Sequence, residues 1–78
     1  MAFLDEMADE IALAALQDEE RSGDEMIVTR IGEVLGASSQ TLQEAYLTAV
    51  RVRRAEKRAK EILAERKAQF EAKQAKDA

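Results

Sequence analysis

Apolar and polar positions follow each other along the chain with the period of an α-helix. Over residues 2–20, apolar side chains recur three and four residues apart, the spacing that lines one face of a helix. This face consists of Leu4, Met7, Ile11 and Ala14, and it is widened by Phe3, Ala8, Ala15 and Leu16. Alternation with a period of two is absent here. The pattern therefore predicts a first helix over residues 2–20 and disfavours a strand.

A second, shorter helix is predicted over residues 23–35. Its apolar positions share one face and are Ile27, Ile31, Val34 and Leu35. Ser22 and Glu25 fit a capping box. In this motif the Ser22 hydroxyl accepts a hydrogen bond from the Glu25 amide, and the Glu25 carboxylate accepts one from the Ser22 amide. Gly36 is predicted to end this helix in the left-handed conformation.

The third predicted helix is much longer than the other two. Ser38 or Ser39 is placed to cap it, and no glycine or proline follows before the end of the chain. A helix over residues 39–74 would be about 54 Å long, whereas a compact chain of this length is only about 30 Å across. We therefore predict an all-α fold with a protruding C-terminal helix. Residues 1–52 would form a small three-helix domain, and residues 53–78 an extension that frays at its end.

A thin apolar stripe continues along the predicted extension. Seven of the nine heptad positions on the third helix are apolar: Leu42, Ala45, Ala49, Val52, Ala59, Leu63 and Phe70, with Glu56 and Arg66 as the exceptions. Beyond Val52 the stripe is longer than two short helices can cover. We therefore predict a self-association seam formed by Val52, Ala59, Leu63 and Phe70, with a homodimer as one expected state.

Charge is distributed unevenly around a net value of −4. Residues 1–25 contain nine acidic residues and one basic residue, whereas residues 51–78 contain ten basic and five acidic residues. Such segments attract each other, within one chain or between two. Two solvated helix faces would show the same distribution. Docking of the acidic first helix on the basic segment 51–60 is therefore one of two interpretations.

The composition excludes several kinds of chemistry. The sequence has no Cys, His, Trp or Pro, which removes disulfides, thiolate and imidazole metal sites, and mechanisms that pair a nucleophile with histidine. Acid–base chemistry would have to come from carboxylates, lysines or Tyr46, and the sequence places no pair of them in a recognisable pocket. The acidic runs lack the ligand spacing of a calcium loop. We expect no catalytic residue, cofactor or metal, and no enzyme activity.

The sequence shows no signal for export or membrane insertion. Its first residues are acidic, unlike a secretory signal. The longest uninterrupted apolar run is residues 11–16, against the roughly 20 residues needed to span a bilayer. We therefore expect a soluble, cytoplasmic protein without a membrane partner.

Residues 31–42 resemble the helix-turn-helix element of small DNA-binding regulators, although they identify no particular family. Gly32 stands at the small position of the first helix, Gly36 at the turn, and Leu42 at the aliphatic position six residues further on. The resemblance implies that the helix after the turn enters the major groove. Together with the basic run on the third helix, it yields six candidate nucleic-acid contacts: Arg30, Gln40, Gln43, Arg51, Arg54 and Arg58.

The charge of the chain argues against DNA as the partner. Residues 18–25, at the start of the helix that would cross the phosphates, are mostly acidic, and the isoelectric point is near 4.8. A DNA-bound domain normally shows a basic footprint. Our leading hypothesis is a non-enzymatic helical protein that docks on an unidentified protein partner. The alternative is a helix-turn-helix DNA-binding regulator that dimerises through its long helix.

Overall fold

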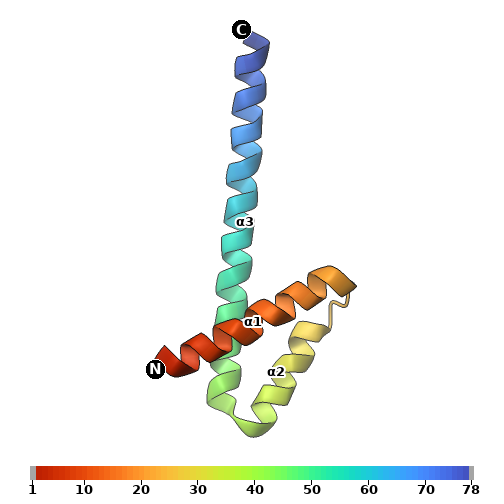
Figure 1. The fold of residues 1–78 in the computed structure, drawn as a ribbon, viewed down its shortest axis with the longest axis vertical. Helices are drawn as coiled ribbons and strands as arrows, with labels where there is room; N and C mark the ends of the chain where they lie inside the picture. The colour runs from red at the N-terminus through yellow and green to blue at the C-terminus, as the bar shows by residue number, and fades with distance from the viewer. Residues whose placement is uncertain (1, 78) are drawn as a thin grey trace.

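The computed structural model describes residues 2–77 and contains three helices with two short connections (Figure 1). They are α1 (Ala2–Ser22), α2 (Ile27–Ser38) and α3 (Gln40–Asp77). Of the described residues, only 23–26 and 39 lie outside a helix. The predicted all-α class, with a long C-terminal helix after two shorter ones, is confirmed.

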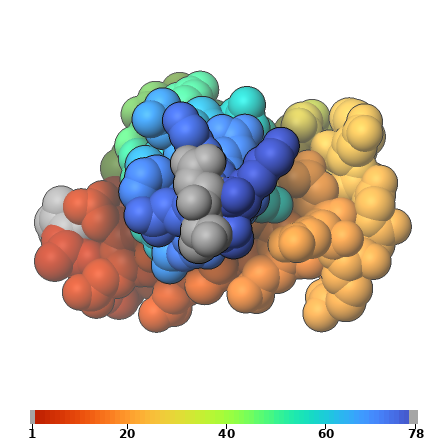
Figure 2. Space-filling model, turned by 90° about the horizontal axis from the view of Figure 1, so that it is seen from above, coloured from red at the N-terminus to blue at the C-terminus, as the bar shows by residue number. Residues whose placement is uncertain are grey.

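Helix α3 extends far beyond the other two helices, which pack beside its first half (Figure 1). It has 38 residues and is therefore about 57 Å long. The radius of gyration is 17.2 Å, against about 11.5 Å for a compact chain of the same length. We call α1, α2 and the part of α3 that they pack against the body. Seen from above, the end of α3 stands over the body, and α1 extends to both sides of it (Figure 2). The predicted protrusion is confirmed, and the expected fraying of the last residues stays a prediction.

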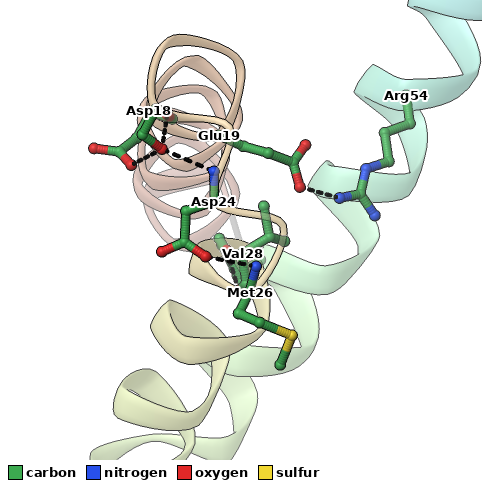
Figure 3. Close-up of polar contacts among 8 residues, drawn as sticks. Asp18, Glu19, Asp24, Met26, Val28 and Arg54 are labelled. Atoms are coloured by element: carbon green, nitrogen blue, oxygen red, sulfur yellow. Dashed lines mark hydrogen bonds and ion pairs between the residues drawn. The ribbon is translucent and has the colours of Figure 1, made fainter.

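The turn between α1 and α2 differs from the predicted capping box. Among residues 2–77, only Gly23 has a positive φ, of 75°, and its amide closes the end of α1 by donating to a carbonyl of the last turn at 2.8 Å. Ser22 is the last residue of α1, and its Oγ accepts from the Asp24 amide at 3.1 Å. Asp24 Oδ1 accepts in turn from the Met26 amide at 2.9 Å (Figure 3). The capping-box prediction is therefore wrong, and α2 begins four residues later than predicted.

The turn between α2 and α3 is a single residue, Ser39. Its backbone is extended, with φ −154°, and its Oγ accepts from an amide in the first turn of α3 at 3.1 Å, so its predicted capping role is confirmed. Gly36 lies inside α2, so the prediction that it ends the helix in the left-handed conformation is wrong. A Cβ there would lie 2.6 Å from the Gln43 side chain, whose Nε2 donates to the Gly32 carbonyl at 2.9 Å. Gly36 therefore serves the close approach of α3 to α2.

Tyr46 lies at the centre of the core, where the three helices meet. It is the largest side chain that is fully buried, and its hydroxyl donates to the Val28 carbonyl at 2.7 Å. A Cβ on Gly32 would lie only 3.4 Å from the Tyr46 ring. The other buried hydrophobic residues are Ala8, Ala12, Ala15, Val28 and Val50. Small residues on α1 and α2 thus allow both helices to approach the one large aromatic ring.

The apolar faces predicted for α1 and α2 agree only in part with the faces that are buried. On α1 the predicted Ala8 and Ala15 are buried, together with Ala12, which was not predicted. On α1 the predicted Phe3 and Ala14 are exposed, and the larger members of the face are only half-buried: Leu4, Met7, Ile11 and Leu16. On α2 the predicted Ile27, Ile31 and Leu35 pack against the core. The predicted Val34 is 65% exposed, and Val28, which was not predicted, is buried. The physical reason is that close helix packing around Tyr46 places the smallest side chains, not the largest, at the contact.

Candidate interaction surface

The four residues of the predicted seam lie on one side of α3, and we call them the apolar stripe: Val52, Ala59, Leu63 and Phe70. The three larger side chains are 61–66% exposed, and Ala59 is exposed as well. At 3.6 residues per turn the four positions fall within about 40° around the helix axis. Tyr46 and Val50, which enter the core, lie about 120–160° away from them. The stripe therefore faces away from the body.

The body covers only the first part of α3. Every residue from 54 to 76 is exposed, and we call residues 54–76 the exposed segment. Three of the four stripe residues belong to this segment, and Val52 lies just before it. A helix with this much uncovered length and an apolar line interrupted only at Glu56 and Arg66 is suited to packing against another helix.

Two adjacent arginines of α3 join it to opposite halves of α1. Arg53 forms a bidentate pair with Asp9, with Nε at 2.6 Å from Oδ1 and Nη2 at 2.7 Å from Oδ2. Arg54 Nη2 lies 3.3 Å from Glu19 Oε2 (Figure 3). The two acidic residues are about 15 Å apart along α1, so the pairs fix how α1 crosses α3. Docking of the acidic first helix on the basic segment is confirmed for these pairs, within one chain.

Each partner in the bidentate pair changes the ionisation of the other. The hydrogen bond from Arg53 holds the pKa of Asp9 below its ordinary value, aided by the positive charge and opposed by partial burial. The same hydrogen bond raises the pKa of Arg53. Both groups therefore stay charged over a wider pH range than in the unfolded chain.

Acid should weaken the fold through Asp9. A carboxylate whose pKa is lower in the folded state stabilises the fold when the pH is above its pKa in the unfolded chain. This stabilisation is lost as the pH falls through the pKa of the folded state. We expect the melting temperature of the wild type to decrease as the pH falls below about 4. The melting temperature of Asp9→Asn should decrease less over the same pH range, because the variant lacks the contribution of the Asp9 carboxylate. Thermal melts between pH 2 and 6 measure it, with Arg53→Gln as the partner-side control. An unchanged acid profile in Asp9→Asn would contradict the assignment.

Three of the six candidate nucleic-acid residues line a groove between α2 and α3, and Arg30, Gln40 and Arg58 do not. This groove, of about 300 Å³, is lined by Gln43, Arg51 and Arg54 and also by the acidic Glu33. Three of the six candidates already have partners within the chain: Gln43 with the Gly32 carbonyl, Arg54 with Glu19, and Arg58 with Glu61 at 3.7 Å. The other three are exposed: Arg30, Gln40 and Arg51. Half of the set is therefore already paired within the chain, and two of these three residues, Gln43 and Arg54, join different helices.

Two features that position this surface were not predicted from the sequence: the pair of Arg53 with Asp9, and the burial of Tyr46 in the core. Arg53 and Asp9 are 44 positions apart, and only the uneven charge of the two segments indicated that such a pair could form. Tyr46 stood out in the sequence as the single tyrosine, but nothing in its neighbourhood indicated that it fills the core. These contacts became visible only once the crossing of α1 and α3 was known.

A second groove lies between α1 and the start of the exposed segment and measures about 540 Å³. Its lining is mixed: Leu13 and Leu16 on α1 lie beside charged side chains of both signs, among them Lys57 and Glu61. Within residues 2–77, no group of three or more acidic side chains is placed to hold a metal ion. No helix in the same range is both long enough and apolar enough to cross a membrane.

Comparison with known proteins identifies no relative. No protein family matches the sequence, no curated protein matches it, and no solved structure matches the fold.

Proposed function

We propose that this chain is a non-enzymatic interaction protein that docks on another helix through the apolar stripe of α3. The observation that carries the proposal is the exposure of Val52, Leu63 and Phe70 in one line on a helix that leaves the body. Single exposed apolar residues are ordinary, but an aligned set is typical of an interaction site. Its heptad spacing is the spacing by which one helix packs against another.

The expected partner is an amphipathic helix with a narrow apolar face. Ala59 leaves a shallow position in the middle of the stripe, and the side chains of Leu63 and Phe70 project beyond it. A partner helix would place larger residues against Ala59 and smaller ones against Phe70. The body, held by Tyr46 and the two arginine pairs, would then support the start of α3 while its exposed segment binds.

Paired substitutions on the stripe test this proposal. The variant Leu63→Glu/Phe70→Glu adds two charges to the stripe, and Ala68→Glu adds one on a side of α3 about 160° away from Phe70. Because these positions are exposed, each change should alter monomer stability by no more than about 0.5 kcal/mol. Circular dichroism checks that all three proteins keep their helices.

Binding is measured with the immobilised chain, against the chain itself and against an extract of the source cells. We expect the wild type and Ala68→Glu to retain a partner, and the double variant to bind it at least about tenfold more weakly. The proposal would be wrong if the wild type binds neither another copy nor any extract protein. It would also be wrong if the double variant binds as well as the wild type.

A further inference from the structure

We infer that the partner of the apolar stripe is a second copy of this chain, packed antiparallel, with Glu56 of each copy opposite Arg66 of the other. The inference rests on the proposed function and adds the identity and the direction of the partner. It comes from the six heptad positions between residues 52 and 70, which are the four stripe residues together with Glu56 and Arg66.

These six positions form three complementary layers when the helices run in opposite directions about residue 61. Val52 then faces Phe70 of the second copy, and Ala59 faces Leu63 of the second copy, so that a smaller side chain meets a larger one in both layers. The only two charged positions face each other with opposite sign, Glu56 against Arg66. Two-fold symmetry repeats each layer, so every one of the six positions has a matched counterpart.

A parallel pair in register lacks this match. It would place Glu56 against Glu56 of the other copy and Arg66 against Arg66, so both charged layers would be repulsive. The two apolar layers at its centre would be Ala59 on Ala59 and Leu63 on Leu63, one too small and one crowded. Charge and size therefore both favour the antiparallel direction, in which a polar pair also fixes the register.

The edges of the antiparallel pair are consistent with this register. Ile62 is 41% exposed beside the stripe and would meet its own copy near the two-fold axis, adding an apolar contact. At the opposite edge Lys60 would also meet its own copy, but its ammonium lies 3.5 Å from Glu56 Oε2 and is exposed to water. Such an edge charge is well hydrated and opposes pairing only weakly.

The body of each copy leaves room for the other helix. In this register the end of the second α3 runs alongside residues 45–52 of the first. Thr48 and Val52 are exposed there, because α1 and α2 pack on the side that carries Tyr46. Ala45 and Ala49 complete that stretch. Both are half-buried against the core of their own chain, so the second helix would contact only the part of each side chain that stays accessible. The two bodies would lie at opposite ends of the paired helices.

Charge exchange tests the pairing of Glu56 with Arg66. Each of the single variants Glu56→Arg and Arg66→Glu places like charges in two layers, so each should raise the dissociation constant of the dimer at least about tenfold. The double variant Glu56→Arg/Arg66→Glu restores opposite charges, and its dissociation constant should be within about threefold of the wild-type value. The control is Glu61→Arg, the same charge change on the far side of α3, which likewise breaks an exposed ion pair within the helix. It should leave the dimer unchanged. Sedimentation equilibrium over a wide concentration range gives the dissociation constants.

Cysteine cross-linking tests the direction independently, since the chain has no cysteine of its own. Ile62→Cys lies near the proposed two-fold axis and should give a disulfide-linked dimer with oxidised glutathione. Gln69→Cys, one heptad further along the same edge, would lie about 24 Å from its copy, too far for a disulfide, and should form no cross-link. In a parallel pair both edge positions would lie on opposite sides of the interface, so neither variant would cross-link. A dimer in which Ile62→Cys forms no disulfide, or in which Gln69→Cys cross-links as well as Ile62→Cys, would overturn the inference.

Self-pairing and the proposed function fail in different ways. A wild-type chain that is monomeric at every concentration, yet captures an extract protein through Leu63 and Phe70, would overturn self-pairing and leave the proposed function standing. A dimer that the single charge changes do not weaken would overturn the register. A chain that binds neither itself nor any extract protein would overturn both proposals.

Discussion

Replacing Tyr46 by alanine is expected to leave most of the protein unfolded at room temperature. Tyr46 is the largest fully buried side chain, and truncating an aromatic ring in a core costs about 3–5 kcal/mol. At the usual stability per residue, a chain of 78 residues has about 4–12 kcal/mol in total. This chain should lie near the lower end, because the exposed segment adds nothing to the core. Urea titration followed by circular dichroism at 222 nm measures the loss.

The matched variant Tyr46→Phe keeps the ring and removes only the hydrogen bond to the Val28 carbonyl. It should cost about 1 kcal/mol. Burial raises the pKa of Tyr46, with a lowering by Arg54 and a smaller raising by Glu19. The stabilisation that comes from the neutral Tyr46 hydroxyl is therefore complete below about pH 10 and is lost as the pH rises through the pKa of Tyr46 in the folded state. The variant Tyr46→Phe should not lose stability in this alkaline range. Equal stability of the alanine and phenylalanine variants would contradict the central role of the ring.

Enlarging Ala12 should have the second-largest effect. Ala12 is completely buried in α1, where small side chains permit the close crossing with α3. Ala12→Leu adds three carbons at this contact and should cost about 1–3 kcal/mol or more. The displaced α1 would also carry Asp9 and Glu19 away from their arginines. The urea midpoint should therefore decrease together with protection of α1 amides from hydrogen exchange.

The control for Ala12 is a position on the same helix. Ala14 is exposed, so Ala14→Leu adds the same carbons to solvent and should change stability by no more than about 0.5 kcal/mol. The packing argument would be wrong if the two leucine variants had the same urea midpoint.

The helices themselves could be predicted from the sequence because their signals are local. The absence of glycine and proline after Gly36 implied one long helix, and Ser39 was correctly identified as one of two possible caps. The buried faces could be predicted only in part. Periodicity analysis favours the largest apolar residues, whereas the fully buried residues that cluster with Tyr46 are mostly alanines, whose pattern in a sequence is hard to distinguish from plain helix propensity.

Glycines show a second limit of local reasoning. A glycine that ends a helix and a glycine that admits a neighbouring side chain look alike in one sequence. Gly36 was assigned the first role and has the second, in contact range of Gln43, whereas Gly23 ends α1. The difference depends on where α3 lies, which is a tertiary fact.

The apolar stripe was predictable in its residues and, beyond Val52, in its exposure. Heptad spacing identified the residues, and the length of the helix indicated that two short helices could not cover Leu63 and Phe70. The exposure of Val52 depends on the packing of α1 and α2 on the other side of α3. The pair of Arg53 with Asp9 was beyond sequence reasoning, because its two residues are brought together by the crossing of two helices that each look self-sufficient.

The uninterrupted course of α3 has a mechanical consequence. Tyr46 and Phe70 lie on one continuous helix, about 36 Å apart at 1.5 Å per residue, with no glycine or proline between them. Sharp helix kinks arise almost always at such residues or at inserted side chains and waters, so this stretch lacks an intrinsic hinge. Whatever binds near Phe70 is therefore held at a set distance from the body and at a set rotation about the helix axis. Inserting one residue after Arg58 would turn the far end by about 100° without changing any contact of the core.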